Sequence, residues 1–130
     1  TRNANFSLLK NGLNPLEDFF ILPEATPGTQ PSWFGFPLTL RSDVPFTRDE
    51  LVIHLNERKI GTRLLFGGNL VRQPYMKGRN FKVSGPLTNS DVVVHRTFWT
   101  GVYPELTHAH IEYVVETIGD FIKNKQNNIV

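Results

Sequence analysis

The sequence has no cysteine, and this absence excludes several classes of protein at once. Without a thiol, the chain can form no disulfide framework, ligate no cysteine-bound iron–sulfur cluster and carry out no thiol catalysis. The usual zinc-finger ligand sets are excluded as well, because each of them includes cysteine.

Long hydrophobic runs are also lacking. The longest wholly apolar stretches have about four residues, far fewer than the roughly 20 that a membrane-spanning helix needs. No basic-then-apolar leader opens the chain, so nothing in it points to secretion. We therefore expect a soluble, cytoplasmic protein that does not engage a membrane.

The residues that are present suffice for a folded core. Among 130 residues there are ten Phe, three Tyr and two Trp, which supply large apolar side chains. Single cores usually run to about 100–150 residues, so we expect one domain over residues 1–130.

The charges are unevenly distributed although the net charge is only +2. From Arg58 to Lys82 there are seven basic residues and no acidic one, which leaves seven basic and twelve acidic residues, a balance of −5, in the rest of the chain. A basic surface on an acidic body favours an anionic ligand such as phosphate. The alternative is a solvated loop with scattered cations.

Hydrophobic spacing and capping signals predict helices that alternate with strands. Helices are expected over residues 1–13, 47–58, 89–95 and 107–123, and strands over 33–40, 59–66 and 98–103. A proline-rich loop is expected at 14–32, a long basic loop at 67–86, and a frayed polar tail at 124–130. This order predicts an α/β (α+β) fold, a two-layer sandwich with a sheet of about three strands.

Several residues suggest catalysis or metal binding, but ordinary structure explains them better. On a helix, His108 and His110 point about 200° apart, and His108 with Glu112 makes an ordinary surface pair. Asp91 and His95 have the spacing of a helical pair, for which a structural role is favoured over a catalytic one. There is no nucleophile motif, Walker loop or dinucleotide fingerprint. We therefore expect no catalytic, cofactor-binding or metal-binding residue on this chain.

The aromatic run Trp33-Phe34-Gly35-Phe36 is superficially similar to the strand on which RNA-recognition motifs stack bases. The basic–glycine pair that precedes those aromatics is absent, and alternate side chains of a strand are more often core. RNA binding is kept only as an alternative, and nucleic acid is not the expected partner.

The densest cluster of polar residues lies in residues 60–75. A strand brings Arg63 to a rim, and Gly67-Gly68 allows close approach of the backbone. Directional donors follow in the loop, namely Asn69, Arg72 and Gln73. This combination suits a lip that binds a phosphate or a sugar nucleotide.

Three motifs occur in order: Trp-Phe-Gly-Phe-Pro at 33–37, Thr-Arg-Leu-Leu-Phe-Gly-Gly-Asn-Leu-Val-Arg-Gln-Pro at 62–74 and Gly-Val-Tyr-Pro at 101–104. With them the chain resembles, over essentially its whole length, the C-terminal small domain of the CDP-4-dehydro-6-deoxyglucose 3-dehydrases. These enzymes belong to the sugar-nucleotide aminotransferase and dehydratase branch of the fold-type I pyridoxal-phosphate enzymes. The resemblance implies a few antiparallel strands covered by helices.

The resemblance also implies a function in deoxysugar and lipopolysaccharide O-antigen biosynthesis, namely C3 deoxygenation of a CDP-4-keto-6-deoxyhexose. Such enzymes use pyridoxamine or pyridoxal phosphate and a cysteine-bound 2Fe–2S cluster, work with a flavin and iron–sulfur reductase, and are expected to be homodimers. These cofactors belong to a large domain outside this chain, so the isolated chain is expected to be inactive.

Carried over by position, the resemblance places substrate-binding residues near the nucleotide sugar: Arg63, Asn69, Arg72, Gln73 and Tyr75. The alternative for their loop is packing against the large domain. Three other functions stay open: the small domain of a pyridoxal-phosphate-dependent sugar aminotransferase, a free-standing anion- or RNA-binding module, and a dimerisation piece that uses the apolar stripe of the first helix.

Overall fold

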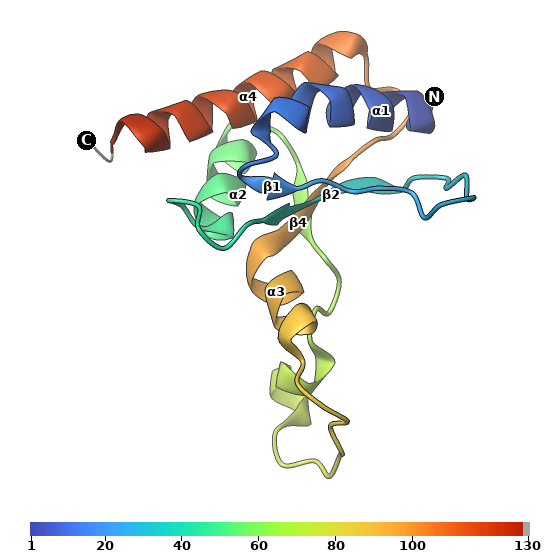
Figure 1. Cartoon of the computed structure of the whole chain (residues 1–130), viewed down its shortest axis with the longest axis vertical. Helices are drawn as coiled ribbons and strands as arrows, with labels where there is room; N and C mark the ends of the chain where they lie inside the picture. The colour runs from blue at the N-terminus through green and yellow to red at the C-terminus, as the bar shows by residue number, and fades with distance from the viewer. Residues whose placement is uncertain (129–130) are drawn as a thin grey trace.

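The computed structural model describes residues 1–128, in which helices and strands alternate (Figure 1). The helices are α1 (Arg2–Leu13), α2 (Arg48–Glu57), α3 (Thr88–Arg96) and α4 (His108–Asn127). The strands are β1 (Phe20–Ile21), β2 (Gly35–Leu40), β3 (Thr62–Leu64) and β4 (Thr97–Gly101). Short 3-10 helices are η1 (Asn14–Leu16), η2 (Leu70–Arg72) and η3 (Pro74–Met76).

The strands form one small sheet in the order β1-β2-β4-β3, and every neighbouring pair is antiparallel. This confirms the predicted mixed α/β class. The sheet has one strand more than the sequence predicts, because β1 lies inside the region expected to be a loop, residues 14–32. Phe20 is fully buried opposite Leu40, which explains why this two-residue strand joins the sheet.

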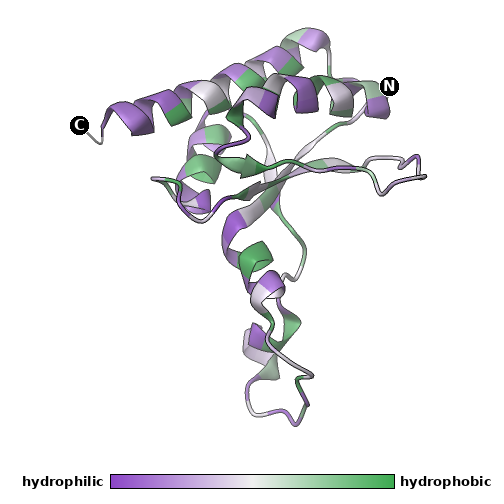
Figure 2. Ribbon diagram, viewed as in Figure 1, coloured by the Kyte–Doolittle hydropathy of each residue, from purple (hydrophilic) through white to green (hydrophobic). Residues whose placement is uncertain are grey.

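The core lies on one face of the sheet. Phe36, Leu38 and Phe98 are fully buried there, and α1 and α4 lie side by side over this face (Figure 1). Figure 2 shows that hydrophobic residues alternate with hydrophilic ones along both helices. The opposite face of the sheet carries the half-buried Pro37 and Trp99 and the exposed Ile21.

Two capping boxes begin the helices that the sequence predicts. The Thr47 side chain accepts a hydrogen bond from the Glu50 backbone, while the Glu50 carboxylate accepts one from the Thr47 backbone at 2.8 Å. Thr107 is capped in the same way, with His110 in place of an acid.

The prediction of a frayed tail at 124–130 is wrong for residues 124–127, which continue α4; residues 129–130 lie outside the described part of the chain. The helix continues because Lys125 forms an ion pair with Glu50 and lies 5.5 Å from the centre of the Phe121 ring. Because this pair joins residues far apart in the sequence, no local pattern predicts it.

Two strand boundaries also differ from the prediction. The third strand covers Thr62–Leu64 instead of 59–66, because Lys59 and Phe66 both adopt left-handed backbone conformations, with φ of 63° and 50°. The residues between β3 and α3 form an extended loop with two 3-10 turns. Together with α3 they make an arm (residues 65–96) that projects from the body (Figure 1).

The contact between Glu50 and Lys125 predicts an acid-dependent loss of stability. The hydrogen bond from Lys125, with those from Thr47, lowers the pKa of Glu50 to about 2. A carboxyl group whose pKa is lower in the folded protein than in the unfolded protein contributes stability at pH values above its pKa in the unfolded protein. This contribution is lost as the pH falls toward 2. Urea unfolding should therefore show that Glu50→Gln has a lower free energy of unfolding than wild type at neutral pH. This difference should shrink as the pH is lowered to about 3. The exposed Glu116→Gln on α4 is the control, and an equal pH profile for both variants would contradict this account.

Candidate functional site

A groove of about 590 Å³ lies between the turn that links α2 to β3, the end of β4, and the first half of α4. Its volume falls within the range of about 300–1,000 Å³ that is typical of small-molecule sites. Its lining includes three cations and three aromatic rings: Arg58, Lys59, Arg63, Trp99, Tyr103 and Tyr113. No acidic side chain among the described residues lines it, so the groove suits an anion attached to a flat or apolar group.

The turn after α2 brings two of these cations to the groove. The backbone N–H groups of Lys59 and Ile60 donate to the carbonyls of Asn56 and Leu55, each at 3.0 Å, and reverse the chain. Ile60 is buried and fixes the turn, whereas Arg58 and Lys59 are exposed. The Tyr113 hydroxyl donates to the Arg58 carbonyl at 3.2 Å and ties α4 to the turn.

Arg63 reaches the groove from β3, an edge strand of the sheet. It lies opposite Trp99 in the ladder, and its guanidinium donates to the Thr62 carbonyl at 2.9 Å. Its side chain is exposed, so its remaining N–H groups are available to a ligand. The expectation that a strand delivers Arg63 to a rim agrees with this position.

The other polar residues of the predicted site lie in the arm, on a segment that we call the lip (residues 67–76). Asn69 and Arg72 are brought together there by Asp91 of α3. One Asp91 oxygen accepts from the Asn69 amide at 2.9 Å, and the other accepts from Arg72 Nη2 at 2.6 Å. Arg72, followed by Asn69, lowers the pKa of Asp91, which keeps this carboxyl ionised.

Asp91 therefore pairs with Arg72 and makes no hydrogen bond with His95 within the described residues, although their spacing on the helix allowed one. The structural Asp91–His95 pair that the sequence favoured is therefore not formed, and the partner of Asp91 is instead Arg72, nineteen residues away. His108 does pair with Glu112, at 3.3 Å on the surface of α4. In the described part of the chain, no cluster of three or more His, Cys, Asp or Glu side chains is placed to hold a metal ion.

The lip is closed by two further contacts. The Gln73 amide donates to the Gly67 carbonyl at 2.7 Å, across the 3-10 turn. Gly68, with φ of 57°, lies against Val94 of α3 so closely that a Cβ atom would meet Val94 Cγ2 at 2.6 Å. Tyr75 follows in η3, and its side chain is 57% exposed.

The structure thus divides the five predicted substrate-binding residues into two groups. Arg63 lines the groove, while Asn69, Arg72, Gln73 and Tyr75 build or follow the lip and do not line the groove. Arg58, Lys59 and Tyr113 were not predicted from the sequence as lining residues. The basic run beginning at Arg58 was a signal for the first two, but no sequence signal pointed to Tyr113.

The structure contains no helix among its described residues that is both long and apolar enough to cross a membrane.

Comparison with known proteins identifies one family. The family model described as "DegT/DnrJ/EryC1/StrS aminotransferase family" matches residues 1–119. The chain is 53% identical over 120 residues to the lipopolysaccharide biosynthesis protein RfbH of Salmonella typhimurium, covering 92% of this chain and 28% of RfbH. It is 50% identical over 121 residues to the dTDP-4-dehydro-2,6-dideoxy-D-glucose 3-dehydratase of Saccharopolyspora spinosa, covering 93% of this chain and 26% of that enzyme.

Among solved structures, the E. coli GDP-4-keto-6-deoxy-D-mannose-3-dehydratase with bound hydrated PLP is similar in fold. Its TM-score is 0.80 at 21% identity, over 90% of this chain and 30% of that one. This chain therefore spans less than a third of the length of the proteins it matches.

Proposed function

Because the chain belongs to the DegT/DnrJ/EryC1/StrS aminotransferase family, we propose that it is the substrate-binding small domain of a sugar-nucleotide 3-dehydratase. The reaction is the removal of the C3 hydroxyl from a nucleotide-linked 4-keto-6-deoxyhexose in deoxysugar and O-antigen biosynthesis. The dehydratase activity is preferred to that of an aminotransferase because a 3-dehydratase is among the relatives with about half of their residues identical. The proposed substrate is a CDP-hexose, as in the enzymes that the three motifs resemble.

The observation that carries this proposal is the groove with its three cations and three aromatic rings. Arg63, with Arg58 and Lys59 beside it, supplies charge-assisted hydrogen bonds to a diphosphate. The rings offer stacking or lining surface for a base or a sugar. The Asp91 carboxylate holds Asn69 and Arg72, and the Gln73 amide closes the turn of the lip. In this proposal the lip lies outside the groove and supplies further contacts to the nucleotide sugar, with the exposed Tyr75 beside them.

The chemistry itself is proposed to lie in the rest of a family-length enzyme. The chain has no cysteine for a 2Fe–2S cluster, and the cations that line the groove suit an anionic substrate. When bound, pyridoxal or pyridoxamine phosphate supplies the electron sink for C–H and C–O cleavage. This chain's residues bind and orient the sugar nucleotide. The proposal also includes the large domain, a homodimer partner, a flavin and iron–sulfur reductase, and a cytoplasmic location.

Substituting Arg63 tests the site. In a hybrid protein in which this chain replaces the matched segment of RfbH, Arg63→Gln should weaken binding of CDP by about 10-fold or more, because a charge-assisted hydrogen bond is lost. Titration calorimetry with CDP, dTDP and GDP measures this loss and also identifies the preferred base.

The matched control is Arg79→Gln, which removes the same charge from the arm, where Arg79 donates to the Tyr75 carbonyl. Equal weakening by both variants would indicate unspecific attraction and would favour the anion- or RNA-binding module, as would steeply salt-dependent binding of single-stranded RNA. Unchanged CDP affinity in Arg63→Gln would remove Arg63 from the site.

A further inference from the structure

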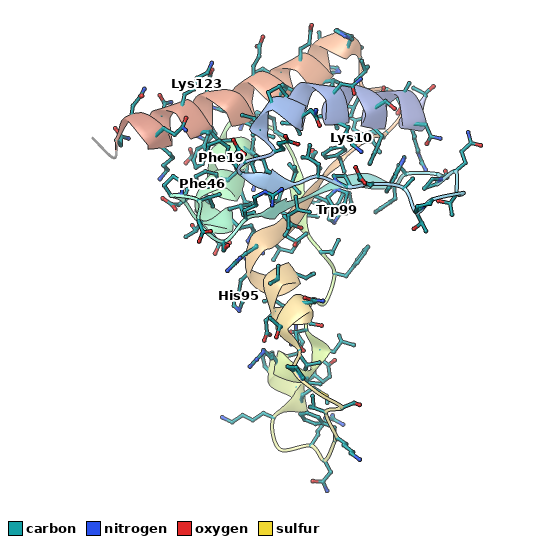
Figure 3. All side chains as sticks on the ribbon, in the orientation of Figure 1. Lys10, Phe19, Phe46, His95, Trp99 and Lys123 are labelled. Atoms are coloured by element: carbon teal, nitrogen blue, oxygen red, sulfur yellow. The ribbon has the colours of Figure 1, made fainter. Side chains whose placement is uncertain are left out.

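An aromatic patch occupies the face of the sheet that α1 and α4 do not cover. We define it by the residues Phe34, Pro37, Leu65, Phe66 and Trp99, which surround an apolar hollow of about 210 Å³. Phe34 is 65% exposed and Phe66 is 80% exposed. Figure 3 labels Trp99 on the side of the sheet away from the two long helices. No charged side chain among the described residues lines this hollow.

The patch has a defined construction. The rings of Phe34 and Trp99 lie 4.9 Å apart and tilted, and the Trp99 indole donates to the Leu64 carbonyl at 3.2 Å. Gly35 lies under Trp99 so closely that a Cβ atom there would meet Cε3 at 2.3 Å. The indole is therefore held over the β2 backbone in one position.

Phe66 adds a strained backbone to this surface. With φ of 50°, it occupies the left-handed region, which is unfavourable for a bulky side chain, while its N–H donates to the Leu64 carbonyl at 2.8 Å. The strain holds an aromatic ring in the solvent, where the ring contributes almost no burial within this chain. A partner surface would bury the ring and offset that cost.

We propose that the aromatic patch is the surface by which this chain docks onto the rest of a family-length enzyme. This inference rests on the proposed function, because it takes the chain to be one part of such an enzyme. More than two-thirds of RfbH and of the Saccharopolyspora dehydratase lie outside the segments matched here, so a large occupant is available in the same polypeptide. The occupant presents an uncharged, apolar surface, because the patch offers large rings and no charge for it to pair with.

The test compares one substitution in two contexts. In the 130-residue chain, Phe66→Asn should leave the melting temperature unchanged or raise it, since asparagine tolerates the left-handed conformation and the lost ring was exposed. In the hybrid with RfbH, the same substitution should lower the melting temperature by several degrees, because a buried interface ring is removed. Phe34→Asn should show the same difference between the two contexts.

The control is Ile53→Asn on α2, where the side chain is 58% exposed and away from the patch. It should change the melting temperature equally in both contexts, because only helix propensity is affected. Hydrogen exchange gives an independent readout, with residues 33–37 and 64–66 more protected in the hybrid than in the isolated chain.

Two outcomes would overturn the proposal. One is an equal effect of Phe66→Asn in the chain and in the hybrid. The other is a concentration-dependent dimer of the isolated chain that Phe66→Asn dissociates, since a second copy would then be the occupant. Trp99 lines both the groove and the hollow, but the readouts at Phe34 and Phe66 do not depend on nucleotide binding, so the docking surface and the substrate groove can fail separately.

Discussion

Phe36→Ala is expected to lower the free energy of unfolding by about 3–5 kcal/mol, as is usual when a fully buried phenylalanine is truncated. Phe36 is inaccessible to solvent in β2, and its ring lies 4.9 Å from that of Phe6 in α1. The substitution therefore removes the contact between the sheet and its helical layer and leaves a cavity at their centre.

Phe34→Ala is the matched control, because it makes the same chemical change two residues away on the other face of the sheet. The Phe34 side chain is 65% exposed, so its loss from the 130-residue chain should cost less than about 1 kcal/mol. Urea unfolding of both variants measures the difference. Similar costs for the two substitutions would mean that Phe34 and Phe36 do not lie on opposite faces of the sheet.

The contrast between Phe34 and Phe36 shows how far a sequence pattern leads. The period of two predicts that alternate aromatics of residues 33–40 share a face, and Phe36, Leu38 and Leu40 are indeed buried together. The same period places Phe34 on the buried face, but Phe34 lies just before β2 begins at Gly35, and its ring packs against Trp99 on the uncovered face. The caps at Thr47 and Thr107 were found because their signals lie within four residues.

What escaped prediction depends on contacts between distant residues. The strand β1 has only two residues, and α4 ends late because Lys125 meets Glu50. In the candidate site, Arg63 lines the groove from the edge strand β3. The partner of Arg72 was not identified, because the local spacing paired Asp91 with His95, whereas the fold brings the Asp91 carboxylate to the lip.

Gly68→Ala is expected to have the second largest effect, on the lip. Gly68 has φ of 57°, where a side chain costs about 1–2 kcal/mol. Its new Cβ atom would also lie 2.6 Å from Val94 Cγ2, and valine on a helix has little rotamer freedom with which to yield. Overpacking of this kind adds about 1–3 kcal/mol, so we expect a local loss of about 2–5 kcal/mol. Hydrogen exchange of residues 68–76 measures it as faster opening of the lip.

Gly78→Ala separates the two causes, because Gly78 also has a positive φ of 77° but no atom lies within 4 Å of its Cβ position. It should incur the backbone cost alone. Val94→Ala added to Gly68→Ala should recover part of the loss, since it removes the atom that clashes. If Gly68→Ala and Gly78→Ala opened the arm equally, or if Val94→Ala gave no recovery, the lip would not be held against α3 by this contact. The positions of Asn69 and Arg72 would then depend on Asp91 alone.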